Sequence, residues 1–566
     1  MAIRPLDEML SVSPQITPHD IAAIAAAGFR SVICTRPDGE AADQPSAATV
    51  EAAAQEAGLS FRSIPVMAGA IGEADIARFR QALDALPGPV LGYCRTGTRA
   101  AMLWALAKVG ERPAAELLGA AAKAGYDLGA LRSRLDAGPR PARAATVDHC
   151  DVLIVGGGAA GLATAASLLK RRPSLAVTVV EPSQTHYYQP GWTMIGGGVF
   201  KPEQTFRAMA EVMPRGVTWV RSSAAGFDPD NNEICLADER RIRYRALVVA
   251  TGLKLDWDAI PGLRESLGHH GVTSNYDLKT APYTWKLVSE LKRGTALFTQ
   301  APMPIKCAGA PQKAMYLSGS HWFDEGRLAD IKIEFHTAAA VLFGVKEYVP
   351  ALMEYVSKYR ADLHFSSRLI SVDGPRKVAT FAVTSADGRT VEETRFFDLL
   401  HVCPPQRPID VVKESSLAGE GGWVDVDPAS LRHKHYANIF ALGDASSAPN
   451  AKTAAAARKQ APVVAENLVA LLGERPLPAR YDGYGSCPLT VERGKIVLAE
   501  FGYGGKLMPS FPQWLIDGTR PSRLAWHLKE QVLPELYWKC MLRGKEWLCE
   551  PAMLDEHVAA CSGTGA

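Results

Sequence analysis

One cysteine of this chain stands among residues that could activate its sulfur. Cys94 ends the apolar run PVLGYC and is followed by Arg95, Gly97 and Arg99 in RTGTRAAMLW. A glycine turn that leads into a helix offers backbone amides, and two guanidinium groups add positive charge. Such a loop cradles an anion and stabilises a thiolate or a persulfide formed on it. The alternative is a turn cysteine without a catalytic role.

A second feature with chemical meaning is a glycine-rich turn, Gly156-Gly157-Gly158-Ala159-Ala160-Gly161, between the apolar run DVLIV and an apolar helix. The first glycine suits a tight turn, the second lets the backbone approach a pyrophosphate, and the third allows close packing of helix on strand. The next apolar run, AVTVVE, ends at Glu181, where a carboxylate could accept the hydroxyls of a ribose. The spacing predicts a dinucleotide site.

Two later strands also end in small-residue turns. ALVVATG ends at Thr251 and Gly252, and ANIFALGD ends at Gly443 and Asp444. Together with the glycine-rich turn they resemble the three FAD motifs of the two-dinucleotide-binding-domain flavoprotein superfamily. That resemblance implies bound FAD, with Asp444 hydrogen-bonded to the ribityl chain. Taken alone, Asp444 could instead cap the helix predicted around residues 452–468.

The segment around Cys307 argues against a pyridine nucleotide as electron donor. The strand ALFTQ runs into APMPIKCAGAPQK, where a second glycine-rich turn would be needed, and the prolines there remove amide donors. Cys307 occupies the region that a nicotinamide would enter. Lys306 and Lys313 lie near it in sequence, and cations lower the pKa of a thiol. We therefore expect thiol or sulfur chemistry at the flavin, unless Cys307 is an inert buried cysteine.

Long stretches between about residue 148 and residue 550 resemble the sulfide:quinone oxidoreductases, in the branch that includes the mitochondrial enzyme. The matching stretches include EPSQTHYYQPGWTMIGGG, SNYDLKTAPYTWK, PIKCAGAPQKAMYLS, HVCPPQRPID, AKTAAAARKQ and YDGYGSCPL. The resemblance implies FAD, bound covalently or not, with Gln189 and Lys452 near it and with Ala159 and Ala160 presenting amides to its phosphates. It also implies that sulfide attacks a cysteine disulfide on one flavin face and that a quinone is reduced from the other. Cys307 matches the family cysteine expected to become the persulfide.

The second redox cysteine is harder to place. The resemblance implies that it follows the Gly443-Asp444 pair, where this chain has Ala445. Alanine can neither close a disulfide nor attack a flavin. Cys403, in the strand end HVCPP, is a hypothetical replacement; it could equally be a buried cysteine that behaves as a small apolar side chain.

The loop at Cys94 also resembles known loops. Tyrosine phosphatases place five residues between nucleophile and arginine, whereas four residues, Arg95 to Thr98, separate Cys94 from Arg99. The shorter loop resembles that of rhodaneses, and the surrounding domain is similar to the phosphatase-like domains attached to persulfide-handling metallohydrolases. A phosphatase would also need a general acid, for which only unplaced groups such as Asp38 are available. The resemblance favours sulfur transfer over phosphate hydrolysis.

These sites require an α/β fold with several domains. We expect a small phosphatase-like or rhodanese-like α/β domain with a parallel sheet, then a flavoprotein with two Rossmann-like domains, and an amphipathic helical tail. The Pro-, Ala- and Arg-rich stretch DAGPRPARAATVD reads as a linker. The predicted ranges are 1–136 for the first domain, 137–148 for the linker, 149–262 with 390–485 for the FAD part, 263–389 for the middle domain and 486–566 for the C-terminal region.

Composition narrows the partners and the location. The 566 residues carry 62 basic and 60 acidic side chains, a balance that argues against binding to nucleic acid. The chain has no C-x-x-C pair, no predicted metal site and no predicted membrane-spanning helix, and its start lacks a secretory signal. The tail mixes aromatic with basic residues, which suits a bilayer surface or a docked helix pair; its aromatic residues are Trp526, Tyr537, Trp538 and Trp547. We expect a cytoplasmic protein peripheral on the inner face of a membrane.

The sequence thus favours oxidation of sulfide, or of a related persulfide or thiol, to sulfane sulfur. Electrons would pass through FAD to a quinone, and Cys94 would relay the sulfur to a small thiol or a sulfur-oxyanion acceptor. One alternative is a flavoprotein that acts on a different thiol or persulfide, which Ala445 permits. Another is a cysteine-dependent phosphatase with a regulatory flavin domain.

Overall fold

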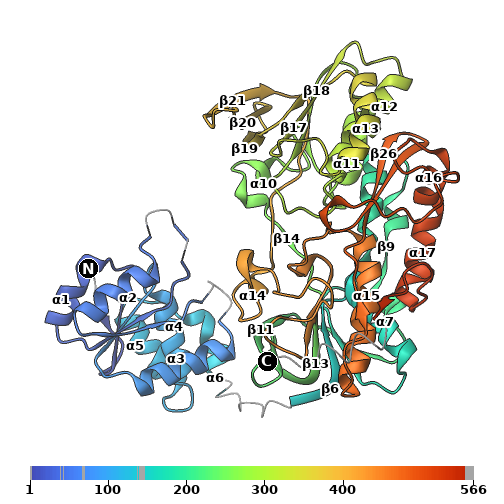
Figure 1. Cartoon of the computed structure of the whole chain (residues 1–566). Coiled ribbons are helices and arrows are strands. Elements are labelled where there is room, and N and C mark those ends of the chain that lie inside the picture. Colours follow the sequence, from blue (N-terminus) through green and yellow to red (C-terminus); the bar gives the residue numbers. More distant parts are fainter. Residues whose placement is uncertain are drawn as a thin grey trace. The chain divides into compact units, whose positions relative to one another are not determined.

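The computed structural model describes residues 3–38, 40, 41, 44–66, 71–136, 138 and 147–554. The chain divides into two compact units, residues 1–146 and 147–566 (Figure 1). Each is considered by itself. Most of the predicted linker, 137–148, lies outside the described residues.

The first unit is built on a five-stranded sheet in the order β1-β2-β5-β3-β4, in which only β1 is antiparallel to its neighbour. The strands are β1 (Arg4–Pro5), β2 (Leu10–Ser13), β3 (Ser31–Cys34), β4 (Ser60–Ser63) and β5 (Val90–Tyr93), and the helices are α1 (Ile21–Ala26), α2 (Ala47–Glu56), α3 (Glu73–Ala85), α4 (Thr98–Ala107), α5 (Ala114–Lys123) and α6 (Arg132–Asp136). Alternate residues of β3 enter different cores: Val32 and Cys34 pack in one and Ile33 in the other. Helices therefore cover both sheet faces, which confirms the predicted α/β domain with a mainly parallel sheet.

The second unit begins with a seven-stranded sheet in the order β10-β7-β6-β13-β12-β11, with β24 paired to β13. Its strands are β6 (Val147–Val155), β7 (Val177–Val180), β10 (Val217–Val220), β11 (Ala224–Asp228), β12 (Glu233–Leu236), β13 (Arg241–Val249) and β24 (Ile439–Ala441). The helices α7 (Ala159–Arg171) and α15 (Ala454–Leu472) pack on each other. Thr453 caps α15, since its hydroxyl accepts a hydrogen bond from the amide of Ala456. This is the expected dinucleotide-binding domain.

The middle domain contains a five-stranded parallel sheet in the order β15-β22-β16-β17-β18 and an antiparallel sheet of β19, β20 and β21. The elements are β15 (Val272–Thr273), β16 (Gly294–Gln300), β17 (Ile331–Thr337), β18 (Ala361–His364), β19 (Ser367–Asp373), β20 (Val378–Thr384), β21 (Thr390–Phe396), β22 (Leu399–His401), α11 (Ala281–Glu290), α12 (Ala310–Asp324) and α13 (Val349–Lys358). The predicted boundary at residue 390 is therefore too early. The chain completes both sheets, through β21 and β22, before it returns to the FAD part.

The predicted boundary at residue 485 also needs correction. The hairpin of β26 (Gly485–Glu492) and β27 (Lys495–Phe501) shares its core with α12 and α13 of the middle domain. Leu489 and Val497 are fully buried there. The first part of the expected C-terminal region thus belongs structurally to the flavoprotein.

The tail forms one helical run of α16 (Arg523–His527), a π-helical turn (Leu528–Val532) and α17 (Leu533–Lys539). Trp526, Tyr537 and Trp538 are buried, because α17 packs on the core of the seven-stranded sheet and Trp526 against the β26–β27 hairpin. Only Trp547 of the four tail aromatics is strongly exposed, at 57%. The tail is therefore largely docked on the protein, and no helix within the described residues is long and apolar enough to cross a bilayer.

Candidate active site

The glycine-rich turn follows β6 and opens α7. At Gly156 and Gly161 a side chain would collide with nearby backbone atoms. Gly156 has φ +110°, and a Cβ there would lie 2.4 Å from the carbonyl oxygen of Ala250. A Cβ on Gly161 would lie 1.9 Å from the carbonyl oxygen of Gly156, so helix and turn are in direct contact. A Cβ on Gly158 would meet no other atom within 4 Å. The turn therefore leaves a cradle at the start of α7 that a phosphate would fit.

The cradle opens into a cavity of about 550 Å³, within the size range of cofactor sites. Residues Gly156 to Ala160, Gln189, Thr251, Gly252, Gly443, Asp444 and Lys452 line it, together with Glu181; of the predicted cofactor-binding residues only Gly161 is absent from the wall. Several buried polar atoms of this wall have no protein partner: Thr251 Oγ1, Trp192 Nε1 and the side-chain amide of Asn275. Unpaired buried groups are costly unless a ligand satisfies them. The residues present therefore fit a large polar-apolar cofactor.

Some predicted cofactor residues bind other parts of the chain. Glu181 accepts a hydrogen bond of 2.8 Å from the amide of Gly157, so its carboxylate also holds the turn. Lys452 donates to the carbonyl oxygens of Asp444 and Ser446, and burial lowers its pKa to about 8. Burial raises the pKa of Asp444. A buried cation and a buried carboxyl group thus face the same cavity.

Cys307 lies on the cavity wall, directly before α12, beside a second sulfur that the sequence analysis had not singled out. Its Sγ is 3.5 Å from the Sγ of Cys487 on β26. A disulfide bond is about 2.0 Å long, so a small movement of the side chains would join the two sulfurs. Cys307 has φ +50°, and its amide donates to the carbonyl oxygen of Lys452. The fold therefore places two thiols side by side, and a disulfide bond could form between them and be reduced again.

The electrostatics of the pair are asymmetric. The hydrogen bond from Cys487 and the ammonium of Lys313, 3.2 Å away, hold the pKa of Cys307 well below its usual value despite burial. The same hydrogen bond to Cys307, together with burial, raises the pKa of Cys487. Lys529, from the π-helical turn, is a second buried cation near both sulfurs, and burial lowers its pKa to about 8. Cys307 is thus the thiolate and Cys487 the thiol of the reduced pair.

Cys403 and Ala445 do not form this pair. The thiol of Cys403 donates to the carbonyl oxygen of Pro404, and burial raises its pKa to about 11. Ala445 is buried in a short helical turn. The sulfur beside Cys307 instead comes from the stretch YGSCPL, 180 positions further along the chain. Where the sequence has Ala445 in place of a second cysteine, the structure therefore places Cys487 beside Cys307.

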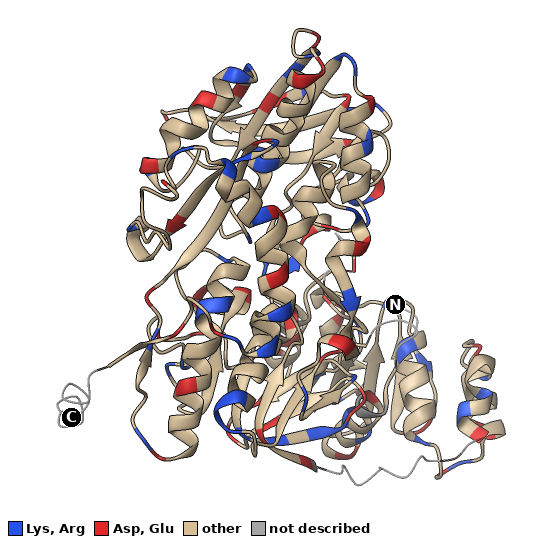
Figure 2. Ribbon diagram, turned by 90° about the vertical axis from the view of Figure 1, so that its right-hand side faces the viewer, with Lys and Arg blue, Asp and Glu red and all other residues tan. Residues whose placement is uncertain are grey.

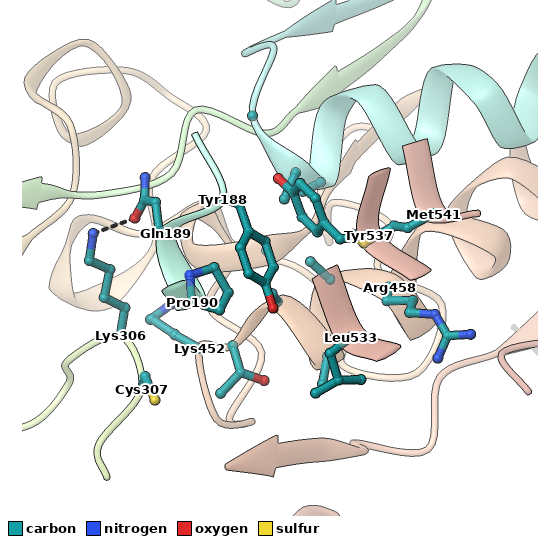
Figure 3. A pocket seen from close by; sticks show the side chains of 18 of the residues that line it. Tyr188, Gln189, Pro190, Lys306, Cys307, Lys452, Arg458, Leu533, Tyr537 and Met541 are labelled. Atoms are coloured by element: carbon teal, nitrogen blue, oxygen red, sulfur yellow. Dashed lines mark hydrogen bonds between the residues drawn. The ribbon is translucent and has the colours of Figure 1, made fainter. Parts of the chain in front are cut away.

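Figure 3 shows one side of the cavity, where Lys306 donates a 2.6 Å hydrogen bond to the side-chain oxygen of Gln189 close to the sulfur of Cys307. The tail supplies another part of the wall, through Leu533, Tyr537 and Met541. Tyr537 is fixed by a hydrogen bond of 2.7 Å between its hydroxyl and Nε2 of His186. The cavity is therefore built from the FAD part, the middle domain and the tail together.

The loop at Cys94 forms a separate site in the first unit. It joins β5 to α4, and the amide of Gly97, which has φ +89°, donates a 3.1 Å hydrogen bond to the sulfur of Cys94. The guanidinium of buried Arg99 makes two hydrogen bonds of 2.7 Å to the carboxylate of Glu40, and these bonds lower the pKa of Glu40 to about 2. Arg95 is exposed. Cys94 thus lies in an amide-lined cradle whose arginine is held in place by a carboxylate.

Comparison with known proteins agrees with this geometry. Residues 150–293 match the family described as Pyridine nucleotide-disulphide oxidoreductase. The chain is 38% identical over 398 residues to Sulfide:quinone oxidoreductase, mitochondrial, of Mus musculus, across 70% of this chain and 87% of that relative. The chain belongs to the sulfide:quinone oxidoreductase family. As in its flavoprotein relatives, a flavin-type cofactor is implied for the cavity.

A solved structure supports the fold of this sulfide:quinone oxidoreductase homologue. The sulfide:quinone oxidoreductase of Aquifex aeolicus superposes with a TM-score of 0.58 at 20% identity, over 71% of this chain and 92% of that one. The extra first unit has a different relative: residues 2–111 match the Beta-lactamase hydrolase-like protein, phosphatase-like domain. The Beta-lactamase hydrolase-like protein of Xylella fastidiosa is 41% identical over 133 residues, 23% of this chain and 30% of that relative.

Proposed function

We propose that this sulfide:quinone oxidoreductase homologue oxidises sulfide to sulfane sulfur with FAD as cofactor and a quinone as electron acceptor. The observation that carries the proposal is the pair of sulfurs of Cys307 and Cys487, 3.5 Å apart at a cavity with two buried lysines. The names of the relatives support the same substrates. Bound FAD would accept two electrons and pass them to the quinone.

The asymmetry of the pair suggests the direction of attack. A thiolate leaves more readily when its pKa is low, so hydrosulfide attacks the sulfur of Cys487 in the disulfide. The S–S bond breaks, Cys487 carries the persulfide, and Cys307 leaves as a thiolate beside Lys313. This assignment differs from the expectation that Cys307 carries the persulfide.

The cycle then returns to the disulfide. The thiolate or sulfur oxyanion of an acceptor attacks the outer sulfur of the Cys487 persulfide and leaves Cys487 as a thiolate. The two thiolates give up two electrons to the cofactor as their S–S bond forms again. Gly158 and Ala159, at the start of α7, would hold the phosphates of FAD, and Asp444 and Lys452 would lie along its remaining length.

Anaerobic addition of sulfide tests this proposal. The flavin absorbance should bleach rapidly and return when a quinone is added in the absence of oxygen. Bleaching by NADH at the same rate, or no response to sulfide, would refute it. The latter result would favour the alternative of a flavoprotein that acts on a different thiol.

We also propose that Cys94 transfers sulfur. Its thiolate, held by the amide of Gly97, would accept the outer sulfur of a persulfide or of thiosulfate, with release of the donor's thiolate or sulfite. The four-residue spacing to Arg99 supports this reaction. The test offers thiosulfate with cyanide, and separately a chromogenic phosphate ester, to the full chain and to Cys94→Ser. Thiocyanate formation that depends on Cys94 supports sulfur transfer, whereas Cys94-dependent release of phosphate alone supports the phosphatase alternative.

The proposed quinone requires access from a lipid phase. Trp514 is 84% exposed and Trp547 57%, with Leu515 and Leu548 also exposed beside them in sequence. We propose that these side chains rest on a membrane surface, as aromatic residues do at bilayer interfaces. The protein should sediment with phospholipid vesicles, and the double variant Trp514→Ser, Trp547→Ser should not. Equal sedimentation of both proteins would contradict this role.

A further inference from the structure

A buried carboxylate on the cavity wall has no part in the reactions described so far. Glu500 lies on β27 and is 5% exposed. Leu498 precedes it by two residues and points to the same face of the strand, and both side chains line the cavity. Among the described residues, no lysine or arginine forms an ion pair with Glu500. This carboxyl group is therefore held at an apolar wall by hydrogen bonds alone.

The hydrogen bonds of Glu500 connect it with solvent. The hydroxyls of Tyr484 and Ser510 each donate to its Oε1 at 2.5 Å, and the amide of Ser510 donates to its Oε2 at 3.0 Å. The two hydroxyl oxygens lie 3.1 Å apart, so either hydroxyl can instead turn and donate to the other. All three side chains line the cavity, and Ser510 is also exposed to solvent whereas Tyr484 is partly buried. The exposed hydroxyl of Ser510 thus connects the carboxyl group of Glu500 with water at the cavity wall.

Quinone reduction creates a need for such a chain. Conversion of a quinone to a quinol consumes two electrons and two protons, and forms two O–H bonds at the former carbonyl oxygens. The reduced flavin would supply the electron pair with at most one proton, so at least one further proton must come from elsewhere. A proton donor on the cavity wall would supply it directly to a quinone oxygen.

Building on the proposed function, we propose that Glu500 is the proton donor to the quinone. Its carboxyl O–H bond breaks as the O–H bond of the quinol forms. The carboxylate left behind regains a proton from solvent through the hydroxyls of Ser510 and Tyr484. The route serves quinone reduction only, because the attack of sulfide on the cysteine pair needs no proton from this wall.

The decisive variant is Glu500→Gln, which keeps the shape and the acceptor oxygen but cannot carry the proton. Stopped-flow absorbance would follow two steps separately, bleaching by sulfide and reoxidation by quinone. Bleaching should keep its rate, and reoxidation should slow on the order of 100-fold. Small weak acids should partly restore reoxidation in the variant. The matched control is Glu492→Gln on the same hairpin, whose carboxylate pairs with Lys358 and Lys495 outside the cavity wall.

A second measurement does not depend on turnover. Infrared difference spectra between the oxidised and the reduced protein should contain a carboxyl C=O band that shifts in heavy water and is missing in Glu500→Gln. Tyr484→Phe, which keeps the ring, should slow reoxidation and weaken its dependence on heavy water. If wild type is bleached by sulfide and restored by quinone, yet Glu500→Gln reoxidises at the same rate, the inference fails while the proposed function stands. If both steps slow equally and weak acids do not help, Glu500 is only structural and the inference also fails.

Discussion

At the scale of single residues, the backbone of Cys307 shows how firmly the reactive sulfur is held. A non-glycine residue at φ +50° is strained, and such strain persists only where surrounding structure fixes it. Here the amide of Cys307 is bonded to the carbonyl oxygen of Lys452, and the sulfur lies between Lys313 and Cys487. The strained backbone thus keeps the thiolate pointed at its two partners.

The first prediction concerns the partner of Cys307. Cys487→Ser should abolish the bleaching of the flavin by sulfide, because no second sulfur remains to form the disulfide. Cys403→Ser is the matched control, since its buried thiol donates to the backbone carbonyl of Pro404 and not to the sulfur of Cys307, and its bleaching rate should stay near that of wild type. Anaerobic stopped-flow absorbance measures both. If only Cys403→Ser loses bleaching, the partner of Cys307 is Cys403, as the sequence suggested, and not Cys487.

At this scale the sequence revealed Cys307 but not its partner. Lys306 and Lys313 lie close to Cys307 in the sequence, so the sequence was enough to predict that the pKa of its thiol is lowered. Cys487 is 180 positions away, and only the packing of the β26–β27 hairpin on α12 brings its sulfur close. The stretch YGSCPL carried the signal, as one of the segments that resembled the family. Lys529 was missed for the same reason, since it reaches the sulfurs from the tail.

At the scale of elements, close backbone contact as well as hydrogen bonding fixes the turn between β6 and α7. Gly161→Ala would place a Cβ 1.9 Å from the carbonyl oxygen of Gly156. The variant should lose flavin and roughly 1–3 kcal/mol of the free energy of unfolding, as overpacked sites do. Gly226→Ala on β11 is the control, because its Cβ would meet nothing within 4 Å. Flavin content and urea denaturation measure the effects; full flavin content in Gly161→Ala would contradict them.

A buried histidine on β22 predicts how the free energy of unfolding depends on pH. His401 is fully buried, its Nε2 accepts a hydrogen bond from the amide of Asn275, and burial lowers its pKa to about 3. The unfolded chain binds this proton near pH 6.5, so between about pH 6.5 and pH 3 the unfolded state holds more protons. The free energy of unfolding should therefore fall with acidification, by up to about 1.4 kcal/mol per pH unit from this group.

Urea denaturation at several pH values measures this slope. His186, whose pKa burial lowers to about 4, adds to it with the same sign. His401→Gln should reduce the slope in that window, even if it lowers stability at neutral pH. An unchanged slope would mean that His401 does not titrate on unfolding.

The order of the elements could be predicted, but their grouping into domains only in part. Alternating apolar runs and helical stretches gave the two α/β units, because strand and helix periods are local properties. The middle domain extends past residue 390, since β22 is inserted between β15 and β16 of its sheet. Likewise, aromatic residues mixed with lysines in the tail suggested a membrane surface or a docked helix pair, and Tyr537 and Trp538 pack on the core of the seven-stranded sheet. Long-range pairing of this kind leaves no mark in a single sequence.

At the scale of the whole molecule, the two units have separate cores and separate sulfur sites. Lysines and arginines are interspersed with acidic residues over the ribbon in Figure 2, in keeping with a net charge of +2. A shared chain raises the effective concentration of one site for the product of the other. The two proposed functions would thus amount to a division of labour, with oxidation of sulfur in one unit and its transfer in the other.

This division predicts separable losses. Cys94→Ser should leave bleaching by sulfide and reoxidation by quinone unchanged, because Cys94 is not part of the flavin cavity. It should abolish thiocyanate formation from thiosulfate and cyanide. Cys487→Ser should lose bleaching by sulfide and keep thiocyanate formation. Parallel assays on the two full-length variants test this, and a Cys94→Ser protein that loses flavin reduction as well would show that the sites depend on each other.

The tail that covers the cavity has a consequence for biosynthesis. Both sulfurs leave the ribosome before Lys529 and before Leu533, which completes the wall. A nascent chain can therefore present both cysteines before this wall exists. A polypeptide that stops short of Leu528 would lack Lys529 beside the sulfurs, and it would also lack Tyr537 and Trp538 from the core of the seven-stranded sheet, so the cavity is assembled only once the tail has docked.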